Sequence, residues 1–104
     1  MSNIQINLKI DEVYTFKLNS GEEVVAKVKQ AGGDWILIND PVSVAPGPQG
    51  MGLMPTLFTA NPESETRLNT NSIAVVAETE SAVKSKYIQA TTGLTVPDKK
   101  LILG

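Results

Sequence analysis

The chain has 104 residues, of which 41% are hydrophobic and 19% charged, and its formal net charge at pH 7 is −2. This length and balance predict one globular domain over residues 1–104. Cysteine and histidine are both absent, which excludes disulfides, thiolate metal sites and histidine-based catalysis. We therefore expect a protein that is not an enzyme and that carries no metal or other cofactor. The negative net charge argues against a protein that coats nucleic acid by bulk electrostatics.

The chain contains no stretch that approaches the roughly 20 apolar residues of a membrane span. Its first residues also lack the basic and then continuously apolar pattern of a signal peptide. We therefore expect a cytoplasmic location and no contact with membranes.

The first half of the chain predicts two successive β-hairpins. Over residues 13–18 the side chains of Tyr14, Phe16 and Leu18 alternate with those of Val13, Thr15 and Lys17, as in a strand with one buried face. After a Ser-Gly turn, residues 22–30 predict a second strand, in which Val25 points outward with the charged residues. Glycines then form another turn, and a third strand begins at Trp35 and bends near Pro41, which cannot donate to a ladder.

The middle of the chain predicts a loop and three short strands. Residues 46–52 are rich in Pro and Gly and predict an exposed, mobile loop. Residues 53–60 predict an edge strand. Two further strands, 66–69 and 73–78, flank the turn-forming triplet Thr70-Asn71-Ser72 and would close a barrel.

A helix is expected only over residues 79–93, where Thr79 provides an N-cap. Its buried stripe would consist of Val83, Tyr87 and Ala90. The tail 94–104 ends in Leu101-Ile102-Leu103, which is too apolar for a solvated terminus unless it docks on its own domain or on a neighbour, and we interpret it as an interface element. Apolar residues alternate over positions 4–10, which predicts a strand that adds to a subunit edge or to a partner.

The strand and turn pattern resembles the Sm and Sm-like (Lsm) family. Leu18, Gly21, Val28 and Asp34, with the apolar run that follows, are similar to the family's first motif, and residues 66–76 to its second. In detail the chain is similar to small Sm-like proteins of cyanobacterial bacteriophages, which share its SGEEVVAKV and GMGLMP segments. The resemblance implies a mainly β fold: a small, strongly bent antiparallel barrel of about five strands over residues 13–78, followed by one C-terminal helix.

Members of this family form rings by pairing strands between neighbouring subunits. The resemblance therefore implies a homo-oligomeric ring, with a pentamer favoured over a hexamer or heptamer, that binds single-stranded RNA. The chain departs from the family pattern in three features. The family's usual N-terminal helix is missing, and the helix expected after the barrel takes its place at the other end. Ile38 stands where the family has an RNA-contacting asparagine, and residues 70–72 replace its basic-glycine-polar turn.

Candidate RNA-binding residues lie in two turns and are Asp34, Trp35, Arg67, Asn69 and Asn71. Trp35 can stack on a base, or it can pack in the core or a subunit interface. Asp34 and the asparagines can contact bases, or they can simply form their turns. Arg67 can supply positive charge to a phosphate.

Met51 and Met54 are candidates for binding a protein partner, because flexible apolar side chains in an exposed loop suit docking. A poorly packed loop lid is the alternative. The alternative function is accordingly a homo-oligomeric scaffold that binds a protein partner without nucleic acid.

Overall fold

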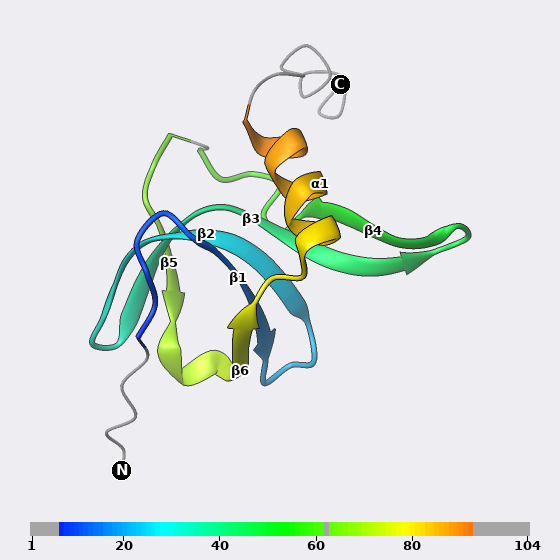
Figure 1. The fold of residues 1–104 in the computed structure, drawn as a ribbon. Coiled ribbons are helices and arrows are strands. Elements are labelled where there is room, and N and C mark those ends of the chain that lie inside the picture. Colours follow the sequence, from blue (N-terminus) through cyan, green and yellow to red (C-terminus); the bar gives the residue numbers. More distant parts are fainter. Residues whose placement is uncertain (1–6, 62, 93–104) are drawn as a thin grey trace.

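The computed structural model describes residues 7–61 and 63–92, which form a six-stranded antiparallel sheet followed by one helix (Figure 1). The elements are β1 (Val13–Leu18), β2 (Glu23–Gly32), β3 (Trp35–Gly47), β4 (Gly50–Pro55), β5 (Thr66–Asn69), the 3-10 turn η1 (Thr70–Ser72), β6 (Ile73–Glu78) and α1 (Ser81–Thr91). The mainly β fold with a C-terminal helix is therefore confirmed. No helix within the described ranges is long and apolar enough to cross a membrane.

The long strand β3 carries two different neighbours along one side. Its first residues pair with β5, from Trp35 opposite Asn69, and its last residues pair with β4, ending at Gly47 opposite Gly50. The main path of the sheet is β4-β3-β2-β1-β6. Since β5 and β6 are joined by η1 alone, the chain passes directly from one border of the sheet to the other. Among the described strands no ladder joins β5 to β6, so the sheet is not closed.

The bend predicted near Pro41 is present. The register between β2 and β3 shifts between Val25 and Lys27, where the opposite strand runs from Val42 to Asn39. Asp40 adopts a left-handed φ of 51° at this point, as residues in β-bulges often do. The bulge bends β3 and so lets its two halves pair with different strands.

One face of the sheet encloses what we call the inner cluster. Its buried members are Tyr14, Phe16, Ala26, Val28, Ile36 and Ile38. Leu68 from β5 and Val76 from β6 pack against it, so five of the six strands contribute. Alternation along the first strands predicted this face correctly. Leu8 also packs here, but residues 7–10 are not a strand, while the rest of the expected N-terminal strand lies outside the described residues.

The opposite face carries what we call the outer cluster, which α1 covers (Figure 1). Its buried members are Val13, Val25, Val42 and Tyr87, with Val44, Leu53 and Val83 packed against them. The prediction that Val25 points to solvent was wrong, because its face of β2 is covered by the helix and only 1% of Val25 is exposed. Strand alternation shows that two faces exist, but not that a helix covers the second.

The helix is shorter than residues 79–93. Its N-cap is Glu80, whose carboxylate accepts a hydrogen bond from the Val83 N–H at 3.1 Å. Thr79 was expected in this role, but its hydroxyl lies 2.9 Å from that of Thr15 on β1. Tyr87 is the buried residue of α1, whereas Ala90 is exposed. The expected buried stripe is thus narrower than predicted, and the tail 94–104 lies outside the described residues.

The expected Pro/Gly loop at 46–52 is instead a tight hairpin between β3 and β4. Pro46 pairs with Met51, and the chain reverses at residues 48–49. Gly50, which directly follows this turn, takes a φ of 106°. A glycine fits this conformation without strain. Strand β4 pairs only with β3 among the described strands, so the expectation of an edge strand is confirmed, although β4 covers Gly50–Pro55 rather than 53–60.

Candidate functional site

Both turns singled out in the sequence meet at one end of the sheet. Trp35 lies opposite Asn69 in the ladder between β3 and β5, and Arg67 lies opposite Leu37. Asp34 immediately precedes Trp35, and Asn71 lies in η1 just after Asn69. We call these five residues, Asp34, Trp35, Arg67, Asn69 and Asn71, the turn cluster. The structure thus brings the candidate RNA-binding residues together.

Hydrogen bonds from Thr70 fix one turn against the other. Its backbone N–H donates to the Asp34 carbonyl at 2.8 Å, and its hydroxyl donates to the same oxygen at 3.1 Å. Asn69 accepts a hydrogen bond from the Asn71 N–H at 2.8 Å through Oδ1. Asn19, in the turn after β1, donates its amide to the Asn71 carbonyl at 2.8 Å. Sequence reasoning missed Thr70 and Asn19, because their partners lie more than 30 residues away along the chain.

The bonding of Asn69 bears on the two interpretations of the asparagines. Its Oδ1 caps η1, which supports the turn-forming interpretation for that oxygen. The amide nitrogen of the same side chain is left to donate elsewhere. Asn71 is exposed, and what its backbone contributes to the turn does not use its side-chain amide. Each asparagine can therefore support its turn and still offer a donor to a ligand.

Trp35 is 49% exposed, so the interpretation that it packs in the core was wrong. Ile36 and Ile38 face the inner cluster, and in a strand the alternating residues point the other way. Trp35 and its neighbour Arg67 therefore share the outer face of the β3–β5 pair. An exposed indole beside amides and a guanidinium can stack on a planar ligand or pack against another subunit.

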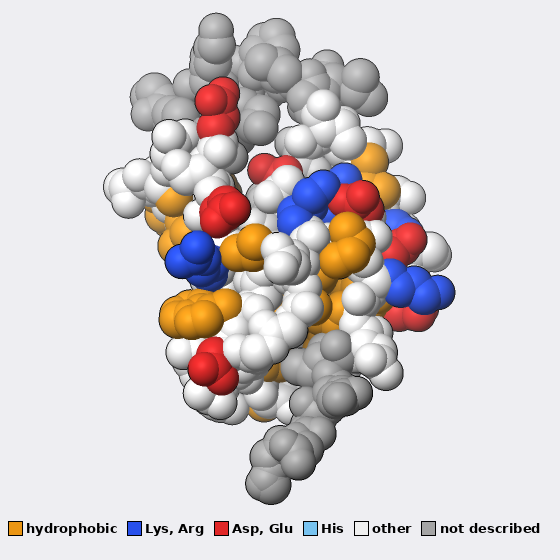
Figure 2. All heavy atoms as spheres, turned by 90° about the vertical axis from the view of Figure 1, so that its left-hand side faces the viewer, with side chains coloured by type: hydrophobic (Ala, Val, Ile, Leu, Met, Phe, Trp, Pro, Cys, Tyr) orange, Lys and Arg blue, Asp and Glu red, His pale blue; other side chains and the backbone are white. Residues whose placement is uncertain are grey.

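The charge around the turn cluster is mixed. Figure 2 shows acidic, basic and hydrophobic side chains interspersed on the side of the molecule that carries β5, with no continuous basic area. Arg67 lies 3.4 Å from the Glu65 carboxylate, and both side chains are mostly exposed. Such an ion pair is easily exchanged for another partner. The cluster therefore offers stacking, amide hydrogen bonds and one available cation rather than a strong positive field.

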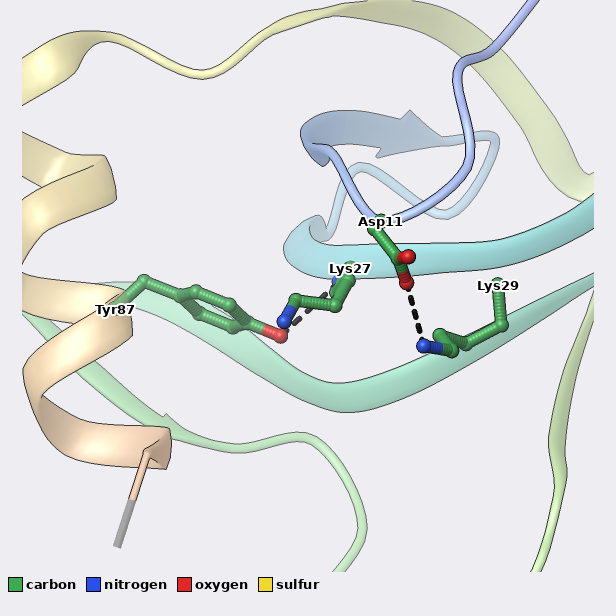
Figure 3. A network of polar contacts seen from close by, with 4 residues as sticks. All are labelled: Asp11, Lys27, Lys29 and Tyr87. Carbon is green, nitrogen blue, oxygen red and sulfur yellow. Dashed lines mark hydrogen bonds and ion pairs between the residues drawn. The ribbon is translucent and has the colours of Figure 1, made fainter. Parts of the chain in front are cut away.

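The lysines of β2 do not form a basic patch. Lys29 binds Asp11 (Figure 3), and this hydrogen bond holds the pKa of the Asp11 carboxyl below its usual value. Lys84 on α1 lies 3.5 Å from Glu12. Lys27 engages Tyr87 through its backbone N–H instead (Figure 3). Neighbouring carboxylates thus offset the positive charge of this side of the molecule.

Met51 and Met54 do not form one surface. Both lie on β4 and are exposed, by 67% and 44%. Because they are an odd number of positions apart, their side chains point to opposite faces of the strand. Of the two, only Met51 lines the groove beside α1, and binding of a protein partner through these methionines stays a prediction. Leu57 and Phe58, just after β4, are exposed apolar residues that sequence reasoning did not single out.

Within residues 7–61 and 63–92, no three acidic side chains gather into a group that could hold a metal ion. A comparison with protein-family models gives no match, and a comparison with curated proteins gives no significant match.

Proposed function

We propose that this chain is an Sm-like protein of the cytoplasm that forms a homo-oligomeric ring and binds single-stranded RNA through the turn cluster. Support for an Sm-like barrel comes from the inner cluster, to which five strands contribute around one apolar interior. The three-residue turn η1 holds the end of β5 next to the start of β6, as closure of a small barrel requires.

The exposed edge of β6 supports ring formation. Among the described strands β6 pairs only with β1, and its sequence IAVVAE contains neither the lysine nor the proline that commonly protects an edge. Val75 is 58% exposed on this strand. We propose that β6 of one subunit pairs with an outer strand, β4 or β5, of the next. Such a head-to-tail contact closes into a ring when the rotation per subunit allows it, and five subunits are favoured over six or seven.

The single observation that carries the RNA proposal is the half-exposed Trp35 beside the two turns. Stacking on an aromatic face tolerates any base and contributes about 1–3 kcal/mol per base. The side-chain amides of the half-buried Asn69 and the exposed Asn71 supply hydrogen bonds to base edges, and Arg67 supplies one phosphate contact. A ring would repeat this weak set of contacts once per subunit, and linked binding events strengthen one another.

The experiment that tests the RNA proposal is fluorescence anisotropy of labelled U-rich and A-rich oligoribonucleotides, with the mass of the protein checked by light scattering in the same buffer. We expect binding to weaken as salt rises, with a shallow slope because each subunit offers one cation. Trp35→Ala should weaken binding about 5- to 150-fold, which corresponds to the loss of one stacked base.

The matched control is Trp35→Phe, which keeps an aromatic face and should retain most of the affinity. Because Trp35 is the sole tryptophan, quenching of its fluorescence by RNA reports directly on this position. If an intact ring binds none of these oligonucleotides, the RNA proposal fails. The protein-partner scaffold then becomes the better account, favoured by the exposed Met51 and Phe58.

A further inference from the structure

An apolar groove lies between α1 and the hairpin of β3 and β4. Its volume is about 210 Å³, far above the 10–15 Å³ that one water molecule needs. The floor is formed by Val25 and Val44, and the sides by Leu53, Met51 and Val83. A groove of this size and composition can accept aliphatic side chains.

The groove exists because α1 covers only part of its face of the sheet. Tyr87 attaches the helix near its C-terminal end, where its hydroxyl donates to the Asn39 carbonyl at 2.9 Å and accepts from the Lys27 N–H at 3.0 Å. Toward its N-terminal end the helix offers only the partly buried Val83 to the outer cluster. The hairpin beside it leaves Met51 67% exposed. Apolar surface on both walls is therefore left without a partner among the described residues.

Two carboxylates stand at the polar rim of this groove. Glu23 on β2 and Glu80 at the start of α1 both line it, while Lys86 is the one basic residue that does so. The rim is thus net negative by one charge in formal terms. An occupant with an apolar end and a preceding positive charge would complement both parts of the groove.

The last twelve residues of the sequence have this chemistry. Leu101-Ile102-Leu103 is apolar, and Lys99-Lys100 precedes it directly. Pro97-Asp98 is a residue pair typical of turns. A turn is needed here, because the segment must reverse direction after the helix to reach the groove. In this segment the two lysines stand directly before the apolar residues. This order matches a groove whose apolar interior lies next to two carboxylates.

The segment is also long enough to reach the groove of its own subunit. Helix α1 has 11 residues and is therefore about 16 Å long. The roughly nine residues from the end of α1 to Leu101 can span up to about 30 Å when extended. The chain can therefore return along the helix to its N-terminal end with length to spare.

We infer that residues 101–103 dock in the groove between α1 and the β3–β4 hairpin of the same subunit, with Lys99 and Lys100 beside Glu23 and Glu80. Docked in this way, the segment completes the outer cluster and joins α1 to the hairpin. The inference does not depend on the proposed function, since it concerns a face of the subunit remote from the turn cluster.

Disulfide trapping in the full chain tests this inference, because the native sequence has no cysteine. Met51→Cys places a thiol on the groove wall, and Leu103→Cys places one in the segment. Under mild oxidation we expect a disulfide within one chain, seen as a faster-migrating monomer on a non-reducing gel. Cysteine is small, Met51 is exposed and Leu103 lies outside the described strands and helix, so both substitutions should leave the fold intact.

The matched control joins Leu103→Cys to Met54→Cys, on the opposite face of the same strand. The Met51 pair should form at least about tenfold faster, since docking raises the effective concentration of the two thiols. Lys99→Glu with Lys100→Glu should slow the Met51 pair at low salt and have little effect at high salt. Equal rates for the two pairs would overturn the inference. So would a disulfide formed between chains, which would assign the groove to a neighbouring copy.

Discussion

The inner and outer clusters lie on opposite faces of the same strands, yet they are completed in different ways. The inner cluster draws on five strands, and Phe16, Ala26 and Val28 are each 0% exposed. The outer cluster depends on one helix, and Tyr87 is its only fully covered contribution from that helix. A sheet that curls on itself buries its concave face without help, whereas its convex face is buried only as far as other elements reach.

The largest expected effect lies in the inner cluster. Phe16→Ala removes a ring that is packed on all sides, and large-to-small changes at such positions destabilise a domain by about 3–5 kcal/mol. Denaturant unfolding followed by circular dichroism measures this loss of free energy of unfolding. An equal loss from Val83→Ala, at the half-buried edge of the outer cluster, would contradict the difference between the two clusters.

The next effect concerns the attachment of α1. Tyr87→Phe keeps the ring but leaves the Lys27 N–H and the Asn39 carbonyl without the hydroxyl that binds both. Unsatisfied groups of this kind cost about 1–3 kcal/mol. Hydrogen exchange should show faster exchange in α1 than in β1 or β2, because the helix detaches before the sheet opens. Uniform acceleration over the whole chain would show that the outer cluster is not a separate unit.

The same hydroxyl predicts a pH dependence. Burial raises the pKa of Tyr87 above its usual value of about 10. The folded state therefore favours the neutral phenol, and its stabilising contribution is complete below about pH 10 and is lost as the pH rises above that value. The difference in free energy of unfolding between wild type and Tyr87→Phe should accordingly shrink in alkaline solution. A difference that grows with pH would contradict this assignment.

The smallest effect is at the helix start. Glu80→Ala removes the side chain that caps the Val83 N–H, and lost N-caps typically cost about 0.5–2 kcal/mol. The low end is expected here because the cap is exposed. Glu80→Gln keeps an acceptor and serves as the control in thermal unfolding. If Glu80→Gln lowers the thermal stability as much as Glu80→Ala does, the negative charge rather than the hydrogen bond is what stabilises the helix start.

The parts of the fold that depend on local chemistry were predictable. Alternation identified β1 and β2, and Gly21 and Gly33 marked two turns, each with a left-handed φ in the structure. The bend at Pro41 follows from its missing N–H. The sequence also placed the two turns of the candidate site correctly, since strand pairing brings Asp34 to Thr70.

The remaining errors share a physical cause, which is that they depend on contacts between distant segments. Val25 is buried by a helix more than 50 residues later in the chain, and no local pattern reports this. The Pro/Gly composition of residues 46–52 indicated a loop, but Pro46 is tolerated in β3 because it lies near the end of the strand, beyond the ladder to β2. The N-cap is Glu80 rather than Thr79, because the Thr79 hydroxyl is hydrogen-bonded to that of Thr15 on β1.

The central claim, that the edge of β6 builds a ring, is tested most directly by the mass of the protein in solution. Light scattering should give about 55 kDa for five subunits of 11.1 kDa, or up to about 78 kDa for seven. Val75→Lys places a charge at the exposed edge and should release smaller species, whereas Ile88→Lys, at an exposed position of α1, should leave the mass unchanged. A wild-type protein that remains a monomer at all concentrations would contradict the account.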